Sequence, residues 1–399
     1  MSNNTPCIML CTEKFQSIYR QEPEFMAFCP YRVCPIGAHI DHQLGKITGF
    51  ALDRGIHIAY KTKLNGVVEL CSLQFSKRAQ WHVAGVPETK VGDWADYLRG
   101  VTIELAARYP IKNGLSGVIE GTLPIGGLSS SAAVCLAFLS ALCKVNRISL
   151  DDNEMMQIAK AAENKYVGVS CGLLDQSCEV LSREAHLLYL DTRDLSYELI
   201  PEHKNMKPYA IGIFFSGLER SLAGSAFNMR VDECRSAAYA VKAYAGLPYG
   251  KFGETSLRDV PRELYLQYRE RLPETWRRRA DHYYGEMERV GAGAEAWRRG
   301  DIEAFGKCIF ESGRSSVDLY ETGSPELKAI YEILLHTDGV YGGRFSGAGF
   351  KGCCMAVIDP SFAGSIQDRV EREYLAAFPQ LRGKYMSCIC HSADGVSAA

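Results

Sequence analysis

Residues 123–133 read LPIGGLSSSAA and continue directly into the apolar segment SSAAVCLAFLSALC at 130–143. The apolar residues of 130–143 fall on nearly every side of a helix, which predicts a buried helix. The two glycines let the backbone approach a ligand closely, and the first N–H groups of a helix have no partner within it. Such a helix start favours an anion, although a turn that only caps a core helix has the same signature. The loop lacks the Gly-x-x-x-x-Gly-Lys-Ser/Thr pattern of a Walker A motif.

The segments around this loop form a mixed pattern of strands and helices. Strands are predicted at 47–61, 67–72, 117–120, 185–190, 209–215 and 353–358. Helices are predicted at 93–109, 151–167 and 325–335, with a long helical region at 228–299. Because strands and helices do not alternate strictly, the pattern favours an α+β fold. A chain of 399 residues predicts two domains, which we place at 1–205 and 206–399.

Composition and charge argue against several classes of function. The net charge is −2 and no basic stripe with interleaved aromatics is present, so nucleic acid is not an expected partner. The run Arg277–Arg279 falls in the helical region and is predicted to be a solvated face. No apolar run approaches the roughly 18 residues of a membrane span, and the N-terminal residues lack the features of a signal peptide.

The fifteen cysteines are scattered from Cys7 to Cys390 without a Cys-x-x-Cys pair. This usage disfavours a zinc site or a redox pair and predicts buried free thiols in a reducing compartment. We expect a cytoplasmic protein that is a monomer or a weak homodimer and has no membrane partner.

The stretch PYRVCPIGAHIDH at 30–42 gathers Arg32, His39, Asp41 and His42 around a Pro-Ile-Gly turn. Taken alone, the His-x-Asp-His pattern is typical of a metal site. Farther along, GRFSGAGFKG at 343–352 has four glycines and is followed by a strand. It indicates a loop that lies close to another group, and a glycine-rich hairpin would look similar.

Two carboxylates, Glu163 and Asp175, flank the bend VGVSCG at 167–172. Glu163 is expected near the end of one helix and Asp175 near the start of the next, so both side chains can face one site. The alternative is one solvated acid and one acid that caps a helix.

The order of these segments resembles the GHMP kinases, the small-molecule kinases named for galactokinase, homoserine kinase, mevalonate kinase and phosphomevalonate kinase. The motifs extend from about residue 30 to 357. PYRVCPIGAHIDH is similar to the sugar-binding signature of the galactokinases, and KYVGVSCGLLDQ at 165–176 to their catalytic bend. The resemblance implies a two-domain α+β fold with the active site in the cleft between the domains.

The resemblance also implies roles for individual residues. Asp175 matches the aspartate that takes the proton from the anomeric hydroxyl of the sugar as this hydroxyl attacks the γ-phosphorus of ATP, and Arg32 matches the arginine beside it. Ser131 and Glu163 match the ligands of Mg²⁺, an ion that accepts hydroxyl and carboxylate oxygens. His39 and Asp41 match sugar-binding side chains, and Gly172 matches a backbone contact to the sugar. The residues that match the ATP phosphate loop are Pro124, Gly126, Gly127, Leu128, Ser129, Ser130 and Ser131.

Two positions depart from the galactokinase pattern. Ala38 stands where galactokinases have a glutamate that binds the 6-hydroxyl, and Phe227 replaces a tyrosine of their sugar pocket. Without that glutamate, a sugar with a carboxylate at C6 is no longer repelled, which indicates galacturonic acid. Arg220 and Arg230 are candidate partners of this carboxylate. A neutral substitution at Ala38, or a sugar with an unsubstituted C5 such as arabinose, also fits.

The predicted function is an ATP- and Mg²⁺-dependent kinase that phosphorylates the anomeric hydroxyl of D-galacturonic acid. The stretches PYRVCPIGAHIDHQ (30–43) and GRFSGAGFKGCCMA (343–356) resemble the galacturonokinases more than the galactokinases. A galactokinase or an arabinokinase is the alternative within this class. From another class, a sensor of the same fold would bind sugar and ATP without turnover. A sensor would need neither Asp175 nor Arg32, which are both present.

Overall fold

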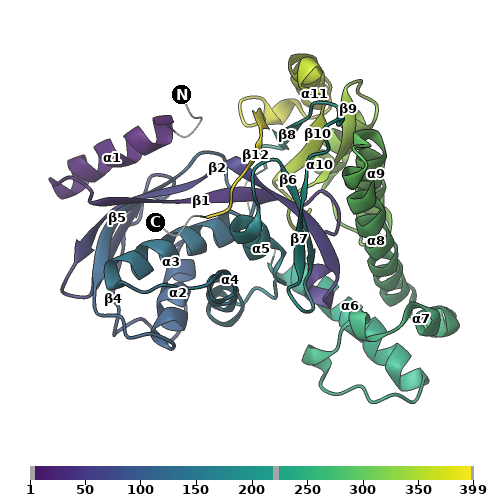
Figure 1. Cartoon of the computed structure of the whole chain (residues 1–399), viewed down its shortest axis with the longest axis horizontal. Coiled ribbons are helices and arrows are strands. Elements are labelled where there is room, and N and C mark those ends of the chain that lie inside the picture. Colours follow the sequence, from purple (N-terminus) through teal and green to yellow (C-terminus); the bar gives the residue numbers. More distant parts are fainter. Residues whose placement is uncertain (1–4, 219–223, 397–399) are drawn as a thin grey trace.

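The computed structural model describes residues 5–218 and 224–396 and contains two β-sheets (Figure 1). The larger sheet has a main path in the order β4–β3–β5–β2–β6–β7, and β1 and β12 also pair with β2. Its strands are β1 (Phe25–Val33), β2 (Lys46–Lys63), β3 (Val67–Ser72), β4 (Ala79–His82), β5 (Gly114–Gly121), β6 (His186–Asp191), β7 (Tyr197–Pro201) and β12 (Ser392–Ala393). The smaller sheet has the order β11–β8–β10–β9 and is antiparallel. Its strands are β8 (Ala210–Phe215), β9 (Val340–Phe345), β10 (Cys353–Ile358) and β11 (Met386–Cys390).

Helices cover both faces of the larger sheet (Figure 1). Alternate side chains of a strand point to opposite faces, so Ala59 of β2 contacts α1 while its neighbours Ile58 and Tyr60 enter the main core. α1 (Thr5–Tyr19) covers the first face. The opposite face carries α2 (Asp96–Ala106), α3 (Ser130–Asn146), α4 (Asp152–Ala161) and α5 (Leu174–Leu181), and a π-helical turn (Ala162–Val167) directly follows α4.

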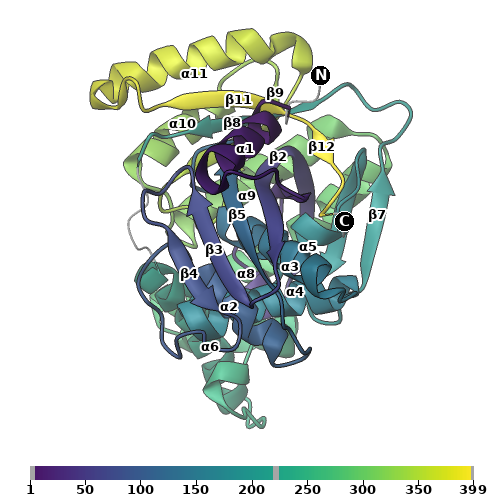
Figure 2. The same cartoon turned by 90° about the vertical axis from the view of Figure 1, so that its left-hand side faces the viewer.

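The remaining helices are α6 (Gly224–Tyr244), α7 (Arg262–Tyr268), α8 (Glu274–Arg298), α9 (Ile302–Asp318), α10 (Pro325–Leu335) and α11 (Ala363–Ala377). Of these helices, α9, α10 and α11 pack against the smaller sheet, α8 lies between α9 and the larger sheet, and α6 and α7 lie away from the smaller sheet (Figure 1). Figure 2 shows α11 lying beside β11 on the outside of the molecule. The predicted helical region at 228–299 divides into α6, α7 and α8, because Pro248, Pro261 and Pro273 cannot continue a helix.

The two sheets share one hydrophobic core. Phe50 of β2 and Trp297 of α8 have ring centroids 5.3 Å apart, and the Trp297 indole donates to the Ile200 carbonyl at 3.1 Å. The chain leaves the larger sheet after β7 and enters the smaller sheet at β8, around the proposed domain boundary after residue 205. Farther along the chain, β12 returns to β2 of the larger sheet. The division into 1–205 and 206–399 therefore stays a proposal, while the helices and the two sheets confirm the α+β class.

The predictions from composition have mixed outcomes. The run Arg277–Arg279 was predicted to face solvent, and this prediction is wrong for Arg279. Its side chain is fully buried, which is possible because two carboxylates and a carbonyl accept its hydrogen bonds. The cysteines are free thiols, and most are buried, as predicted. Among the described helices, none has the length and apolar character that crossing a membrane requires.

Candidate active site

The end of β1 and the first turn of α5 bring Arg32 and Asp175 together. Arg32 donates from Nε to Asp175 Oδ1 at 2.8 Å, and its Nη2 lies 2.7 Å from the same oxygen. The Arg32 side chain is 3% exposed and that of Asp175 is 26% exposed. Burial alone would lower the pKa of Arg32. The negative charge of Asp175 outweighs this effect and raises the pKa above its usual value, so Arg32 stays protonated. Since both contacts use Oδ1, the second carboxylate oxygen of Asp175 is not engaged by Arg32.

The two glycine-rich loops pack directly against each other. A Cβ at Gly126 would lie 2.9 Å from the Cα of Gly352, and a Cβ at Gly127 would lie 3.0 Å from the Ser346 carbonyl. The Gly127 carbonyl accepts from Ser346 Oγ at 2.6 Å and from Arg32 Nη1 at 3.1 Å. The stretch 343–352 is indeed a β-hairpin, which joins β9 to β10. The glycines therefore allow a close approach of two protein loops beside the Arg32–Asp175 pair.

The loop predicted to hold phosphate leads into α3 as expected. Ser129 precedes the helix with a φ of 62° and makes no side-chain cap, and the first turn of the helix carries no acidic residue. The buried hydroxyl of Ser129 has no hydrogen-bond partner within the described parts of the chain. Ser130 and Ser131 are half-buried in the first turn, Leu128 is buried and Pro124 is exposed. This helix start has the features of an anion site.

Glu163 lies in the π-helical turn and belongs to the same site as Asp175. Its side chain is buried, and Oε2 accepts from Gln176 Nε2 at 2.6 Å. Gln176 directly follows Asp175, so one hydrogen bond links the two carboxylate positions. The chemistry of Ser131 and Glu163, one hydroxyl and one carboxylate, fits Mg²⁺, which takes few protein oxygens when phosphates and water complete its shell. Within the described residues, no group of three or more His, Cys, Asp or Glu side chains is arranged to hold a metal.

Asp41 and Gly172 are in direct contact, as expected for one pocket. A Cβ at Gly172 would lie 2.1 Å from Asp41 Oδ2, so this position has no room for a side chain. The backbone N–H of Leu174 donates to Asp41 Oδ2 at 3.3 Å. Burial and then the nearby charge of Asp175 raise the Asp41 pKa to about 6. The stretch 30–42 and the segment after the bend 167–172 therefore meet at Asp41.

His39 and His42 lie on either side of Tyr320. The His39 ring stacks on Tyr320 with centroids 4.5 Å apart, and the buried His39 Nε2 has no partner among the described residues. His42 Nε2 lies 2.9 Å from the Tyr320 hydroxyl, and Gln43 Nε2 donates to His42 Nδ1 at 3.0 Å. Burial lowers the pKa of His42 to about 3 and that of His39 well below its usual range. Both ring nitrogens of His42 are engaged in these contacts, so His42 has no nitrogen left to bind a metal. This argues against the interpretation of His-x-Asp-His as a metal site.

The turn that carries Ala38 is held by α8. The Ala38 carbonyl accepts from His282 Nε2 at 3.2 Å, and the Gly37 N–H donates to Glu286 Oε1 at 2.7 Å. The side chain of Ala38 is buried. Position 38 therefore contributes no carboxylate to this part of the structure.

Phe227 and Arg230 lie one helical turn apart near the start of α6. The Phe227 ring meets the His42 ring edge-on at 5.9 Å. Arg230 Nη1 donates to both carboxylate oxygens of Glu233, at 3.1 and 3.0 Å, and Nη2 contacts the Glu321 carbonyl at 3.4 Å. Arg220, the other candidate partner of a sugar carboxylate, lies outside the described residues.

Sequence reasoning missed the residues that support the sugar-binding stretch from the second half of the chain. They are His282 and Glu286 on α8, and Tyr320 in the segment after α9. These residues stand in ordinary helical sequence or just after it, and no spacing distinguishes them from surface residues. His282 also gives no local signal, because Asp281 precedes it and Arg278 and Glu286 lie one helical turn away.

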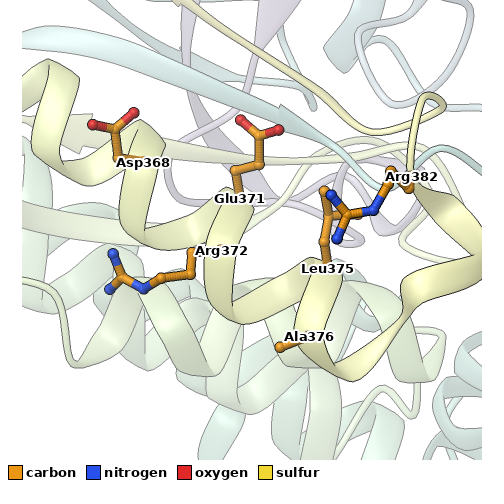
Figure 3. A pocket seen from close by; sticks show the side chains of 6 residues that line it. All are labelled: Asp368, Glu371, Arg372, Leu375, Ala376 and Arg382. Atoms are coloured by element: carbon orange, nitrogen blue, oxygen red, sulfur yellow. The ribbon is translucent and has the colours of Figure 1, made fainter.

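A separate hollow of about 480 Å³ lies on the outer side of α11, away from these residues (Figure 3). Asp368, Glu371, Arg372 and Arg382 point around it, with Leu375 and Ala376 at its base. Its two carboxylates and two guanidinium groups balance, so the hollow favours neither an anionic nor a cationic ligand. None of the predicted site residues lines it.

Models of known families match three parts of the chain. The N-terminal domain of GHMP kinases matches residues 88–183, and the C-terminal domain of GHMP kinases matches residues 294–377. The galactokinase galactose-binding signature matches residues 13–62, which include Arg32, Ala38 and Asp41.

Several known proteins are similar along nearly the whole chain. A galacturonokinase of Arabidopsis thaliana is 36% identical over 389 residues, which cover 92% of this chain and 91% of that protein. A galactokinase of Homo sapiens is 32% identical over 371 residues and covers 90% of both chains. The structure of a Lactococcus lactis galactokinase complexed with galactose superposes with a TM-score of 0.86 at 26% identity, covering 98% of this chain and all of that one.

Proposed function

The chain belongs to the galactokinase branch of the GHMP kinases, and from this premise we propose that it phosphorylates the anomeric hydroxyl of D-galacturonic acid. A sugar kinase, with an alcohol group as acceptor and ATP as co-substrate, follows from the family. The identity of the sugar is the proposed part. The observation that carries it is Ala38, whose short side chain leaves no carboxylate at this position.

In the proposed mechanism, Asp175 is the base. Arg32 occupies Oδ1 of this carboxylate, and Oδ2 is the oxygen that receives the proton of the anomeric hydroxyl. The protonated guanidinium keeps the carboxylate ionised and lies where negative charge develops on the transferred phosphoryl group. The oxygen of the sugar forms the new bond to the γ-phosphorus as the bond to ADP breaks. Phosphoryl transfer of this kind depends mainly on positioning and on neutralisation of charge.

The phosphates of ATP are proposed to lie at the start of α3. The uncapped N–H groups there and the glycine backbone of Gly126 and Gly127 supply donors without adding negative charge. Ser131 and Glu163 would hold Mg²⁺, which neutralises phosphate oxygens when bound.

The sugar is proposed to lie over Asp41, Gly172 and His39. A carboxylate, a backbone contact and a neutral imidazole can accept from and donate to its hydroxyl groups. Toward C6, the missing glutamate at position 38 removes a repulsive charge, and Arg230 supplies the positive partner that a buried carboxylate needs. Phe227 contributes an apolar wall beside His42. The galacturonokinase relative from Arabidopsis thaliana supports the same substrate.

The test is ADP release, measured in a coupled assay with galacturonate, galactose, glucuronate and arabinose. We expect the highest kcat/KM with galacturonate. A clear preference for galactose or arabinose would overturn the uronate proposal and support the alternative kinases. Absence of ADP release with every sugar, together with measurable binding of sugar and ATP, would support a sensor instead. The cytoplasmic location and the monomeric or weakly dimeric state remain proposals without a bearing on this test.

A further inference from the structure

Arg279 is the buried centre of an ion-pair cluster near the proposed sugar site. Its side chain is fully buried, although it belongs to a run of three arginines near the start of α8. Nε lies 2.6 Å from Glu233 Oε2, Nη2 lies 2.5 Å from Glu321 Oε2, and Nη1 donates to the Leu319 carbonyl. We call Arg230, Glu233, Arg278, Arg279 and Glu321 the Arg279 cluster.

Within this cluster, Glu233 is shared between two arginines. Its Oε2 accepts from Arg279 at 2.6 Å and from Arg230 Nη1 at 3.0 Å. The negative charge of Glu233 is therefore divided, and Arg279 reduces how much of it acts on Arg230. Glu321 does not compensate on the Arg230 side, because its carboxylate binds Arg278 and Arg279 while only its backbone carbonyl contacts Arg230.

Arg230 keeps one edge of its guanidinium open. Its side chain is 14% exposed, and within the described residues its buried Nε has no hydrogen-bond partner. The neighbouring Nη2 has a single long contact of 3.4 Å to a carbonyl. The Nε–Nη2 edge of an arginine is one of the two edges that bind a carboxylate through two parallel hydrogen bonds. An unpaired donor in a buried position is unfavourable unless a ligand completes it.

The Arg279 cluster is in contact with the residues of the sugar pocket. The Arg279 guanidinium carbon lies 5.9 Å from the centre of the Tyr320 ring, and Tyr320 stacks on His39. Arg230 binds the carbonyl of Glu321, the residue next to Tyr320, and it follows Phe227 by one helical turn. Arg230 is thus linked to His39 through Glu321 and Tyr320.

The geometry points to Arg279 as a positioning residue for substrate choice: by sharing Glu233, it leaves Arg230 with the positive charge and the open edge that receive a carboxylate at C6 of the sugar. This inference rests on the proposed function and deepens it. Arg279 does not touch the sugar and acts only through Glu233 and Arg230.

The test compares kcat/KM for galacturonate and galactose in Arg279→Met, Glu233→Gln and the double variant. In Arg279→Met, the negative charge of Glu233 acts on Arg230 only. We therefore expect the ratio of kcat/KM for galacturonate to kcat/KM for galactose to fall about tenfold. Glu233→Gln removes the competing charge, so its ratio should stay at or above the wild-type value. The double variant should recover most of the ratio lost in Arg279→Met, because Arg230 again has no anion to neutralise it. Arg299→Met, on the exposed end of α8, is the matched control.

A purely structural role of the cluster predicts equal losses for both sugars and no recovery in the double variant, and either result would overturn the inference. If Arg279→Met does not fold, a Glu233→Gln variant whose ratio falls below the wild-type value overturns it alone. Failure of the proposed function is a separate result, since it would appear as poor use of galacturonate by the wild-type enzyme.

Discussion

The Arg32–Asp175 pair and the Arg279 cluster are two arrangements of charge near the proposed sugar site, each centred on a buried arginine. In the first, a single arginine binds one oxygen of a carboxylate, and the other oxygen is left open to accept a proton. In the second, two arginines share a carboxylate, and an edge of one arginine is left open to donate to an anion. The comparison teaches that the atom without a partner defines the chemistry, while its paired neighbours hold it in position. One arrangement offers a base for C1 of the sugar and the other a cation for C6.

The largest effect is expected from Asp175→Asn, which tests the first arrangement. The amide cannot take the proton of the anomeric hydroxyl, so kcat should fall by at least about 10²–10⁴-fold. ADP release measures this loss, and ATP binding followed by a fluorescent nucleotide should be retained. Full activity of the variant would remove Asp175 from the role of base.

Ala38→Glu tests the second arrangement by adding a charge of the wrong sign. A carboxylate at position 38 would lie near the C6 carboxylate and repel it, so we expect kcat/KM for galacturonate to fall roughly 10²-fold relative to galactose. Ala38→Ser adds a small group without charge and serves as the control. An unchanged sugar preference in Ala38→Glu would mean that C6 is recognised elsewhere.

Arg230→Met removes the open edge itself. The loss of a charge-assisted hydrogen bond should lower kcat/KM for galacturonate about tenfold and leave galactose nearly unaffected. Arg314→Met, at an exposed ion pair on α9, provides the matched control. Equal losses for both sugars in Arg230→Met would show that Arg230 supports the fold of the pocket rather than the carboxylate.

The smallest effect concerns stability at acid pH and involves His282, which holds the Ala38 carbonyl. Burial lowers its pKa to about 4, whereas an unfolded histidine has a pKa of about 6.5. Between these values the unfolded chain binds more protons, so the free energy of unfolding falls as the pH falls through this window. Between pH 7 and pH 5, the free energy of unfolding measured by urea titration should therefore fall by about 2 kcal/mol less in His282→Gln than in the wild-type protein.

The matched control for this measurement is Gln80→Asn at an exposed position, which changes no titratable group and should leave the pH dependence unchanged. A His282→Gln variant with the wild-type pH dependence would show that His282 is protonated equally in the folded and unfolded protein.

The first arrangement could be predicted from the sequence because its residues lie in local motifs. Gly126, Gly127 and Asp175 occupy turns and helix starts, where backbone geometry restricts the residue type. The second arrangement could not, because Glu233, Arg279 and Tyr320 come from separate elements and meet only through tertiary packing. A run of arginines has the same local pattern whether all of them face solvent or one of them is buried, so Arg279 was misassigned. The strands and helices were largely predictable, since their apolar periodicity is local.

The hydrogen bonds of Arg32 also bear on how the protein folds. This one side chain joins residues 143 positions away, at Asp175, and 314 positions away, at Ser346. Closing loops of such length carries an entropic barrier that is crossed before the contacts reward it, and contacts between distant residues slow folding. The base and the phosphate loop should therefore acquire their geometry together, in a late step that requires both halves of the chain. Activity regained during refolding would then lag behind the recovery of helical signal.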